Sequence, residues 1–447
     1  MKAKLVTSLT ALFAGAGLAL AQTPPSSPYR LIDHSSSGNV TQASALEPVS
    51  DIIPGNRPTL SLAPITGPEA TGLAPPAPAS SGCKDAFDSH HVEPCNRFWA
   101  SAEYLVWWTK SSRVPPLAAT APGQFAGRDI PADQLTPIFG DTHLDFQAYS
   151  GARFSAGYML DDEGSLGIDA NYFFTETRVK RFIGGSTGDP LLGPTFFDLG
   201  TNRETIVTDA FPGQFRGVVS VEAPSRFWGT EANVSVGVQP VFSDRLRLFA
   251  GFRYFELSEA LTRVDQATGI GDNAGVVITG LDHFGTRNQF YGGQVGFAAH
   301  SHMGVNWTLD LIGKFAMGGV RELINIDGAS TFAQPGQPIA LGNGNLLALG
   351  TNSGHFRKSK FAVLPELTVN LGYRITSHLN AFMGYNLIYL DKVARPADQI
   401  DFGVNTSQIT FLAGSPGVLN GAARPAPLLH SDSFWAQGMN FGLEFSY

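Results

Sequence analysis

The residues with the greatest chemical potential in this 447-residue sequence do not form a complete catalytic site. Asp282 with His283, and Asp398 with Asp401, are the acidic and histidine residues that could serve a hydrolase at the rim of a β-structure. Adjacent residues of a strand point to opposite faces, so Asp282 and His283 make a poor dyad. We favour the interpretation that these four residues are polar loop residues that form turns. We find no nucleophile paired with a base, and we predict no enzyme activity, no metal and no cofactor.

Two cysteines are the other reactive groups. Cys83 and Cys95 flank His90 and His91, so a disulfide and a Cys/His metal site both fit the residue types. The spacing matches no zinc pattern. In an oxidising compartment one disulfide closing this small loop would stabilise the fold by about 2–3 kcal/mol, because it lowers the chain entropy of the unfolded state. We therefore predict a Cys83–Cys95 disulfide.

The first residues indicate that the chain is exported. Lys2 and Lys4 precede an apolar run from Leu5 to Leu20, and the small residues up to Ala21 suit a signal peptidase. A transmembrane anchor is the alternative, but the run is shorter than the roughly 20 residues that span a bilayer. We predict a signal peptide over residues 1–21. Residues 22–96, rich in Pro, Ala and Ser, are expected to form a disordered periplasmic tether that ends in the cysteine loop.

The composition of the whole chain favours a β-rich membrane protein. Only 15% of the residues are charged, against about 25% in ordinary soluble domains, while the chain holds 50 Gly and 32 Phe. No later window is apolar enough for a membrane helix, so any crossing must use strands. The net charge of −8 and the lack of long basic runs exclude nucleic acid as a partner.

Alternation of apolar and polar residues predicts the elements that carry these side chains. From Phe98 onward one face is apolar and the other holds Asn, Ser, Thr and Gly with sparse charges, which suits a water-filled lumen better than the charged exposed face of a soluble β-sandwich. The predicted strands cover residues 98–110, 144–160, 164–180, 214–239, 244–259, 276–300, 304–327, 357–374, 377–392 and 432–447.

The connections between these strands alternate in length. Links after the second, fourth, sixth and eighth strands are short, whereas the five others are long. This asymmetry is typical of an outer-membrane barrel with periplasmic turns and extracellular loops. We therefore predict an all-β, transmembrane, antiparallel up-and-down barrel over residues 97–447. It has about ten strands, with twelve as the alternative, and both ends in the periplasm. Tyr158, Trp307, Tyr373 and Tyr447 lie where the periplasmic aromatic girdle should fall.

Charged residues on the inward face are expected to pair across strands, because unpaired charges are costly in a low-dielectric lumen. Asp310 and Lys314 share one face of a strand, and neighbouring strands could bring Arg153 toward Asp169. Ten strands leave a narrow interior. The predicted inward-facing charged residues are Glu103, Arg153, Asp169, Glu231, Arg247, Arg253, Asp310, Lys314, Glu366, Arg374 and Glu444.

The chain resembles known outer-membrane proteins at its end and along its length. Asn440, Gly442, Phe445 and the terminal Tyr447 are similar to the signal read by the bacterial barrel-assembly machinery. "RFWASAEYLVWWTK" at Arg97, "AGFRYFELSEAL" at Ala250 and "GYNLIYLDKVARPADQID" at Gly384 resemble the Putative beta barrel porin-7 family, as do further segments. Together these segments cover essentially all of residues 97–447. Ala397 departs from the glycine usual in that family.

Three functions remain open from the sequence. The resemblance implies a porin-like barrel of the bacterial outer membrane whose narrow polar lumen passes small solutes or ions. The alternative is a non-conducting structural or surface-interaction barrel that acts through five long external loops, and a rim-located hydrolase is a third class. The expected partners are outer-membrane lipid and the barrel-assembly machinery. The sequence does not indicate an oligomeric state.

Overall fold

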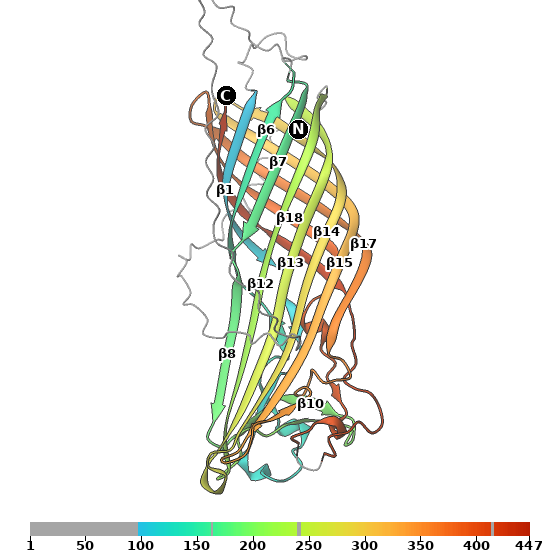
Figure 1. Cartoon of the computed structure of the whole chain (residues 1–447). Coiled ribbons are helices and arrows are strands. Elements are labelled where there is room, and N and C mark those ends of the chain that lie inside the picture. Colours follow the sequence, from blue (N-terminus) through green and yellow to red (C-terminus); the bar gives the residue numbers. More distant parts are fainter. Residues whose placement is uncertain (1–96, 162–163, 239–242, 413–414) are drawn as a thin grey trace, which may run out of the picture. The chain divides into compact units, whose positions relative to one another are not determined.

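Ten antiparallel strands form a closed ring in the computed structural model (Figure 1), which describes residues 97–161, 164–238, 243–412 and 415–447. Around the ring the order is β12, β13, β14, β15, β17, β18, β20, β1, β6 and β7, and β7 pairs again with β12. The strands are β1 (Phe98–Thr109), β6 (Tyr149–Met159), β7 (Leu166–Thr175), β12 (Phe215–Val238), β13 (Arg245–Gly269), β14 (Val277–Met303), β15 (Trp307–Ala333), β17 (Gly354–Arg374), β18 (Leu379–Val393) and β20 (Asp432–Ser446). The predicted ten-stranded barrel is confirmed.

Alternation along each strand separates an apolar outside from a mixed inside. On β1, for example, Tyr104 is 51% exposed while its neighbour Leu105 is fully buried. Large apolar side chains are exposed on every ring strand, and a continuous apolar surface of this kind is stable against hydrocarbon rather than water. Members of this band include Phe154, Ile168, Val234, Phe252, Val295, Phe315, Leu367, Met383 and Phe441. None of the helices in the described residues is long and apolar enough to cross a membrane.

The two ends of the barrel differ in their connections. At one end, here called the turn end, short segments join β6 to β7, β12 to β13, β14 to β15 and β17 to β18. The turn end lies at the top of Figure 1, and the opposite end is here called the loop end. The exposed side chains of Tyr158, Trp307, Tyr373 and Tyr447 all lie at the turn end. The Trp307 and Tyr373 rings are 5.0 Å apart.

One side of the ring extends far beyond the other at the loop end. Strands β13 and β15 continue to Gly269 and Ala333, past their predicted ends, and β8 (Arg178–Ser186), which was not predicted separately, pairs with the outer part of β12. The link between β13 and β14 is therefore short and covers only residues 270–276. The chain has four long loops at this end, and the expectation of five was wrong. Gly271 and Gly275 reverse the chain there at φ values of +58° and +90°, which favour glycine.

Three of the four long loops form small sheets at the loop end, and the loop between β15 and β17 contributes β16, which pairs with β15. Strand β3 pairs with β4 and β9, β2 pairs with β5, and β10 pairs with β11 and β19, so loops distant in sequence are bonded together. The small strands are β2 (Ser112–Val114), β3 (Ala118–Ala121), β4 (Thr136–Phe139), β5 (Thr142–Leu144), β9 (Leu191–Gly193), β10 (Thr195–Asp198), β11 (Arg203–Ile206), β16 (Ala340–Gly342) and β19 (Gly403–Val404). Short 3-10 helices cover Gly123–Phe125, Ala132–Gln134, Gly271–Asn273, Ala397–Gln399 and Thr406–Gln408.

A hydrophobic core joins these loops to the extended strands. Leu117 and Phe196 from the loops pack with Phe284 of β14 and Ile324 of β15, and all four are almost completely buried. The loops therefore lie against the inner face of the extended strands and form a packed body at the loop end.

Candidate functional site

Six charged side chains meet in the middle of the lumen and are here called the ion belt: Glu103, Arg153, Glu231, Arg253, Lys314 and Glu366. None of these side chains is more than 11% exposed. They come from β1, β6, β12, β13, β15 and β17, and three acids face three bases. The belt is thus neutral in sum, which is the condition under which buried charges are tolerated.

Glu366 is the centre of the ion belt. It pairs with Arg153, whose Nη2 lies 3.3 Å from Oε1, and also with Arg253. Arg153 is 3.8 Å from Glu103, while Glu231 pairs with Lys314. Amide side chains fill the remaining acceptor positions at normal hydrogen-bond distances. Asn386 donates to Glu366 at 2.8 Å, Asn440 to Glu103 at 2.9 Å, and Gln294 to Glu231 at 3.2 Å.

Two pairings suggested by the sequence do not form. Arg153 meets Glu103 and Glu366, whereas Asp169 accepts a hydrogen bond from Asn233 at 2.8 Å. Asp310 contacts His300 on β14 rather than Lys314 on its own strand. The reason is geometric, because strand tilt brings residues of different strands and different heights together inside a barrel.

On the loop-end side of the ion belt, an aromatic layer fills the lumen: Trp107, Tyr149, Phe173, Phe227, Phe255 and Phe434. Each of these residues is at most 3% exposed. Phe227 of β12 stacks on Trp107 of β1 with ring centroids 5.9 Å apart, and it meets Phe434 of β20 edge-on at 5.5 Å. Strands β12 and β20 are not neighbours in the ring, so side chains from separate walls touch across the lumen.

The two layers contact each other directly. The Arg153 guanidinium lies 5.3 Å from the Trp107 ring and 5.7 Å from the Phe173 ring, within the range of cation–π attraction. Arg153 therefore belongs to the ion belt and also packs against the aromatic layer. The ion belt and the aromatic layer therefore follow each other along the lumen, one ion-paired and the other apolar.

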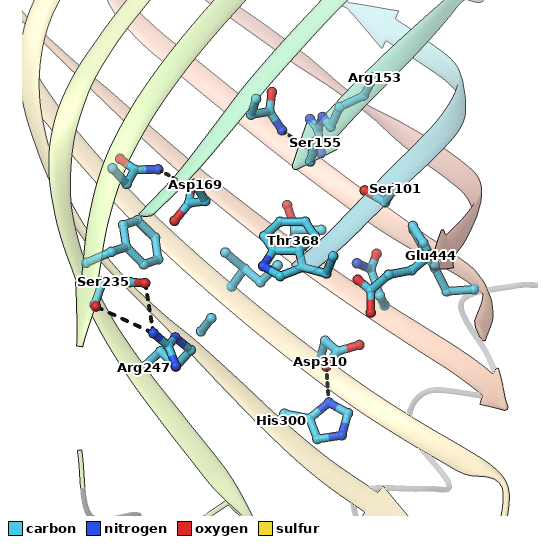
Figure 2. Close-up of a pocket in the computed structure, with 18 of the residues that line it drawn as sticks. Ser101, Arg153, Ser155, Asp169, Ser235, Arg247, His300, Asp310, Thr368 and Glu444 are labelled. Atoms are coloured by element: carbon cyan, nitrogen blue, oxygen red, sulfur yellow. Dashed lines mark hydrogen bonds and ion pairs between the residues drawn. The ribbon is translucent and has the colours of Figure 1, made fainter. Parts of the chain in front are cut away.

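On the turn-end side of the ion belt lies a polar cavity of about 290 Å³ (Figure 2). Its wall includes Asp169, Arg247, Asp310 and Glu444 among the predicted inward charges. Arg247 donates to Ser235 Oγ at 3.0 Å and to the carbonyl of Gly164 at 2.8 Å, which ties two strands to the turn. Asp310 and His300 Nδ1 are 2.5 Å apart. Arg374 meets His302 at 3.2 Å on the turn-end rim.

At the loop end, Asp282 anchors a long loop rather than serving as a rim acid. Its carboxylate accepts hydrogen bonds from the backbone N–H groups of Leu346, Leu347 and Ala348 at 3.2, 3.0 and 2.7 Å, and it pairs with Arg263. The Asp282 and Arg263 side chains are each 1% exposed. Sequence reasoning missed Arg263, although its inward parity on the extended β13 was a usable signal.

Three further buried contacts hold the loop that follows β18. Arg395 donates to both carboxylate oxygens of Glu259, at 2.6 and 2.9 Å, and to the Lys110 carbonyl at 3.1 Å. The Asn288 side chain both donates to and accepts from the backbone of Ala394. These groups were not singled out in the sequence, because strand alternation does not show which loop backbone returns to which strand.

The candidate hydrolase residues are occupied by structural contacts. His283 lies on the face opposite Asp282 and meets Thr262 Oγ1 at 2.8 Å. Asp401 forms a two-contact pair with Arg424 and accepts from the Ala426 N–H at 2.6 Å. Burial and the nearby Asp432 carboxylate raise the pKa of Asp398. In the described ranges, no group of three or more His, Cys, Asp or Glu side chains could hold a metal ion.

The proposed assembly signal occupies the last ring strand. Asn440 points into the lumen toward Glu103, whereas Phe445 and Tyr447 are 46% and 75% exposed on the outside of the turn end. At Gly442 a Cβ would come within 2.5 Å of the Phe382 ring, so only glycine fits there without a shift. The predicted signal peptide, the tether and the Cys83–Cys95 disulfide lie outside the described residues.

Comparison with known proteins gives a family for this chain. No curated protein matches it. The outer membrane protease OmpT from Escherichia coli aligns at 9% identity and a TM-score of 0.35, covering 80% of this chain and 99% of its own. A Pseudomonas aeruginosa FadL homologue aligns at 8% identity and a TM-score of 0.21, covering 79% of this chain and 91% of its own. Residues 99–447 match the family described as Putative beta barrel porin-7. The chain belongs to this family of outer-membrane β-barrel proteins.

Proposed function

We propose that the protein is a non-conducting outer-membrane barrel that presents a rigid surface built from its long loops. The observation that carries the proposal is the packing of the aromatic layer across the lumen. Phe227 touches rings on β1 and β20, and every ring of the layer is buried. A hydrated ion crossing this level would have to displace close-packed aromatic side chains, and even a narrow apolar constriction that is not filled excludes water.

The ion belt adds a second obstacle. Its charges are compensated within the lumen, so they offer no unpaired site that could replace the hydration shell of a passing ion. The family name and the expected polar lumen favour solute passage, but the polar cavity of about 290 Å³ lies on the turn-end side of both layers. We therefore favour the surface-interaction hypothesis over the channel hypothesis.

The loop body supports the second half of the proposal. Asp282, Arg395 and Asn288 fix two long loops through buried hydrogen bonds, and a hydrophobic core lies beneath them. Loops ordered in this way present a constant surface, which lowers the conformational entropy lost on binding a partner. In this proposal the loop end faces the outside of the cell and the turn end faces the periplasm.

Planar-bilayer recording of the refolded full-length protein tests the closed lumen. We expect no reproducible unitary current in molar KCl, while a general porin reconstituted in parallel conducts. A heat-modifiable gel shift and resistance to added protease in the same lipid confirm that the protein is folded and inserted. Reproducible current steps of uniform size would contradict the proposal.

The orientation is tested separately by labelling intact cells with a membrane-impermeant maleimide. Val418 lies in a loop at the loop end and is 70% exposed, and Val305 lies in a turn at the turn end and is 86% exposed. We expect Val418→Cys to react in intact cells and Val305→Cys to react only after lysis. The reverse pattern would overturn the assignment of the loop end to the cell exterior.

A further inference from the structure

A row of aromatic side chains crosses the outside of the extended strands on the loop-end side of the apolar band. Trp228 of β12 lies 4.9 Å from Tyr254 of β13, and Tyr254 lies 5.1 Å from Tyr291 of β14, measured between ring centroids. Phe361 of β17 continues the row and is 68% exposed. Aromatic side chains at this position on a membrane barrel mark the depth of the lipid headgroups.

Immediately beyond this row lies a second row, which is basic. Strand pairing places Arg226, Ser258, Arg287, Leu323 and Arg357 on one line across β12, β13, β14, β15 and β17. The adjacent line, one step closer to the aromatic row, includes Glu256, Gln289 and Arg321. Side-chain alternation puts all these residues on the outer face, and the strands that carry them lie side by side in Figure 1. We call Arg226, Arg287, Arg321 and Arg357 the arginine row.

Nearby acidic side chains neutralise only part of the positive charge of the arginine row. Arg287 pairs with Glu256 at 2.8 Å while remaining 52% exposed. Among the described residues, Arg226, Arg321 and Arg357 have no hydrogen-bond or ion-pair partner, and Nε of Arg321 is buried without an acceptor. Four guanidinium groups therefore face one carboxylate on this stretch of the wall.

We propose that the arginine row binds the phosphate groups of an anionic lipid headgroup in the leaflet at the loop end. Guanidinium groups bind phosphate through paired, charge-assisted hydrogen bonds, and adjacent strands are about 4.8 Å apart, so several arginines reach one headgroup. A lipid fits better than a soluble phosphate because the row adjoins the apolar, lipid-facing surface. Assigning that leaflet to the cell exterior rests on the proposed function.

Native mass spectrometry of the full-length protein in detergent tests the site, with diphosphoryl lipid A as the probe. We compare the wild type with the variant Arg226→Gln, Arg321→Gln and Arg357→Gln. The matched control is Arg128→Gln, Arg181→Gln and Arg216→Gln, which removes the same charge from exposed arginines elsewhere at the loop end. We expect about tenfold weaker retention of the probe by the row variant and little change in the control.

Two further arms identify the source of the phosphate. Dephosphorylated lipid A should be retained equally by the wild type and the row variant, and millimolar inorganic phosphate should not displace diphosphoryl lipid A. Displacement by inorganic phosphate would instead assign the row to a soluble anion. Equal loss of the probe in the row variant and the charge-matched control would reduce the effect to net charge and overturn the proposal.

Misfolding of a variant and failure of the proposed function can both be distinguished from failure of the lipid site. Heat modifiability on a gel confirms that each variant is folded. The single variant Arg357→Gln changes one exposed arginine that has no partner among the described residues, and we expect it to lose less retention of the probe than the triple variant. Binding in detergent requires neither an orientation nor a closed lumen. If the barrel conducts, the proposed function is contradicted, but the lipid-retention measurement can still be interpreted. If both row variants retain diphosphoryl lipid A as well as the wild type does, the lipid site is refuted and the proposed function is not affected.

Discussion

Replacing Phe227 by alanine should destabilise the barrel more than any lipid-facing substitution of the same type. The side chain is 1% exposed and contacts rings from Trp107, Tyr149, Phe173 and its other aromatic neighbours. Truncating a buried phenylalanine costs about 3–5 kcal/mol. The upper part of this range applies, because the hydrogen-bonded ring of strands cannot contract to fill the void.

Phe252→Ala is the matched control for this substitution. Phe252 lies on β13, faces outward and is 53% exposed, so lipid can occupy the space that its ring leaves. The whole ring still passes from water into hydrocarbon on folding, so its transfer free energy of about 1.5–3 kcal/mol is lost, but no cavity term is added. The two variants therefore differ by about 1–3 kcal/mol in the free energy of unfolding, which is the cavity term that only the packed layer leaves.

Urea unfolding in lipid vesicles, followed by tryptophan fluorescence, measures both variants under the same conditions. We expect the lowest midpoint for Phe227→Ala, and for Phe252→Ala a midpoint between that of Phe227→Ala and that of the wild type, both at an unchanged slope. Planar-bilayer current should stay absent in Phe227→Ala because the ion belt still blocks the lumen. Equal midpoints for the two variants would refute the idea that a close-packed aromatic layer closes the barrel.

Three other substitutions probe the charged groups. Glu366→Gln leaves the ion belt with three bases and two acids, so it should lower the unfolding free energy by about 3–5 kcal/mol in the same urea assay. Asp282→Ala should make its loop sensitive to added protease, whereas His283→Ala on the opposite face should not. Burial and the nearby Asp265 raise the pKa of Asp209, so ionising Asp209 destabilises the fold. Asp209→Asn should therefore be more stable than the wild type near neutral pH, and this advantage should shrink as the pH falls toward the pKa of an unfolded aspartate, about 3.9. An advantage that is constant across pH would contradict this reasoning.

The amino-acid sequence by itself determined the number, order and approximate position of the membrane strands. Period-two alternation is a local property, because a strand in a membrane barrel must present hydrocarbon-compatible side chains at every second residue. All ten predicted ranges contain or closely overlap a ring strand. The prediction was less accurate beyond the membrane, where β8 and the outer part of β13 continue the sheet. The outward face is polar there, and the alternating signal weakens.

Only the tertiary structure decided what the lumen contains. Alternation placed Arg153 on the inner face but did not give the height at which it meets residues of distant strands. That height depends on strand tilt and on the stagger between neighbours, which are properties of the closed ring as a whole. Closure brings Phe227 against Phe434 and Arg153 against Glu366. The lumen that the sequence indicated to be polar therefore also contains an apolar aromatic layer, because packing across the ring is not encoded in any single strand.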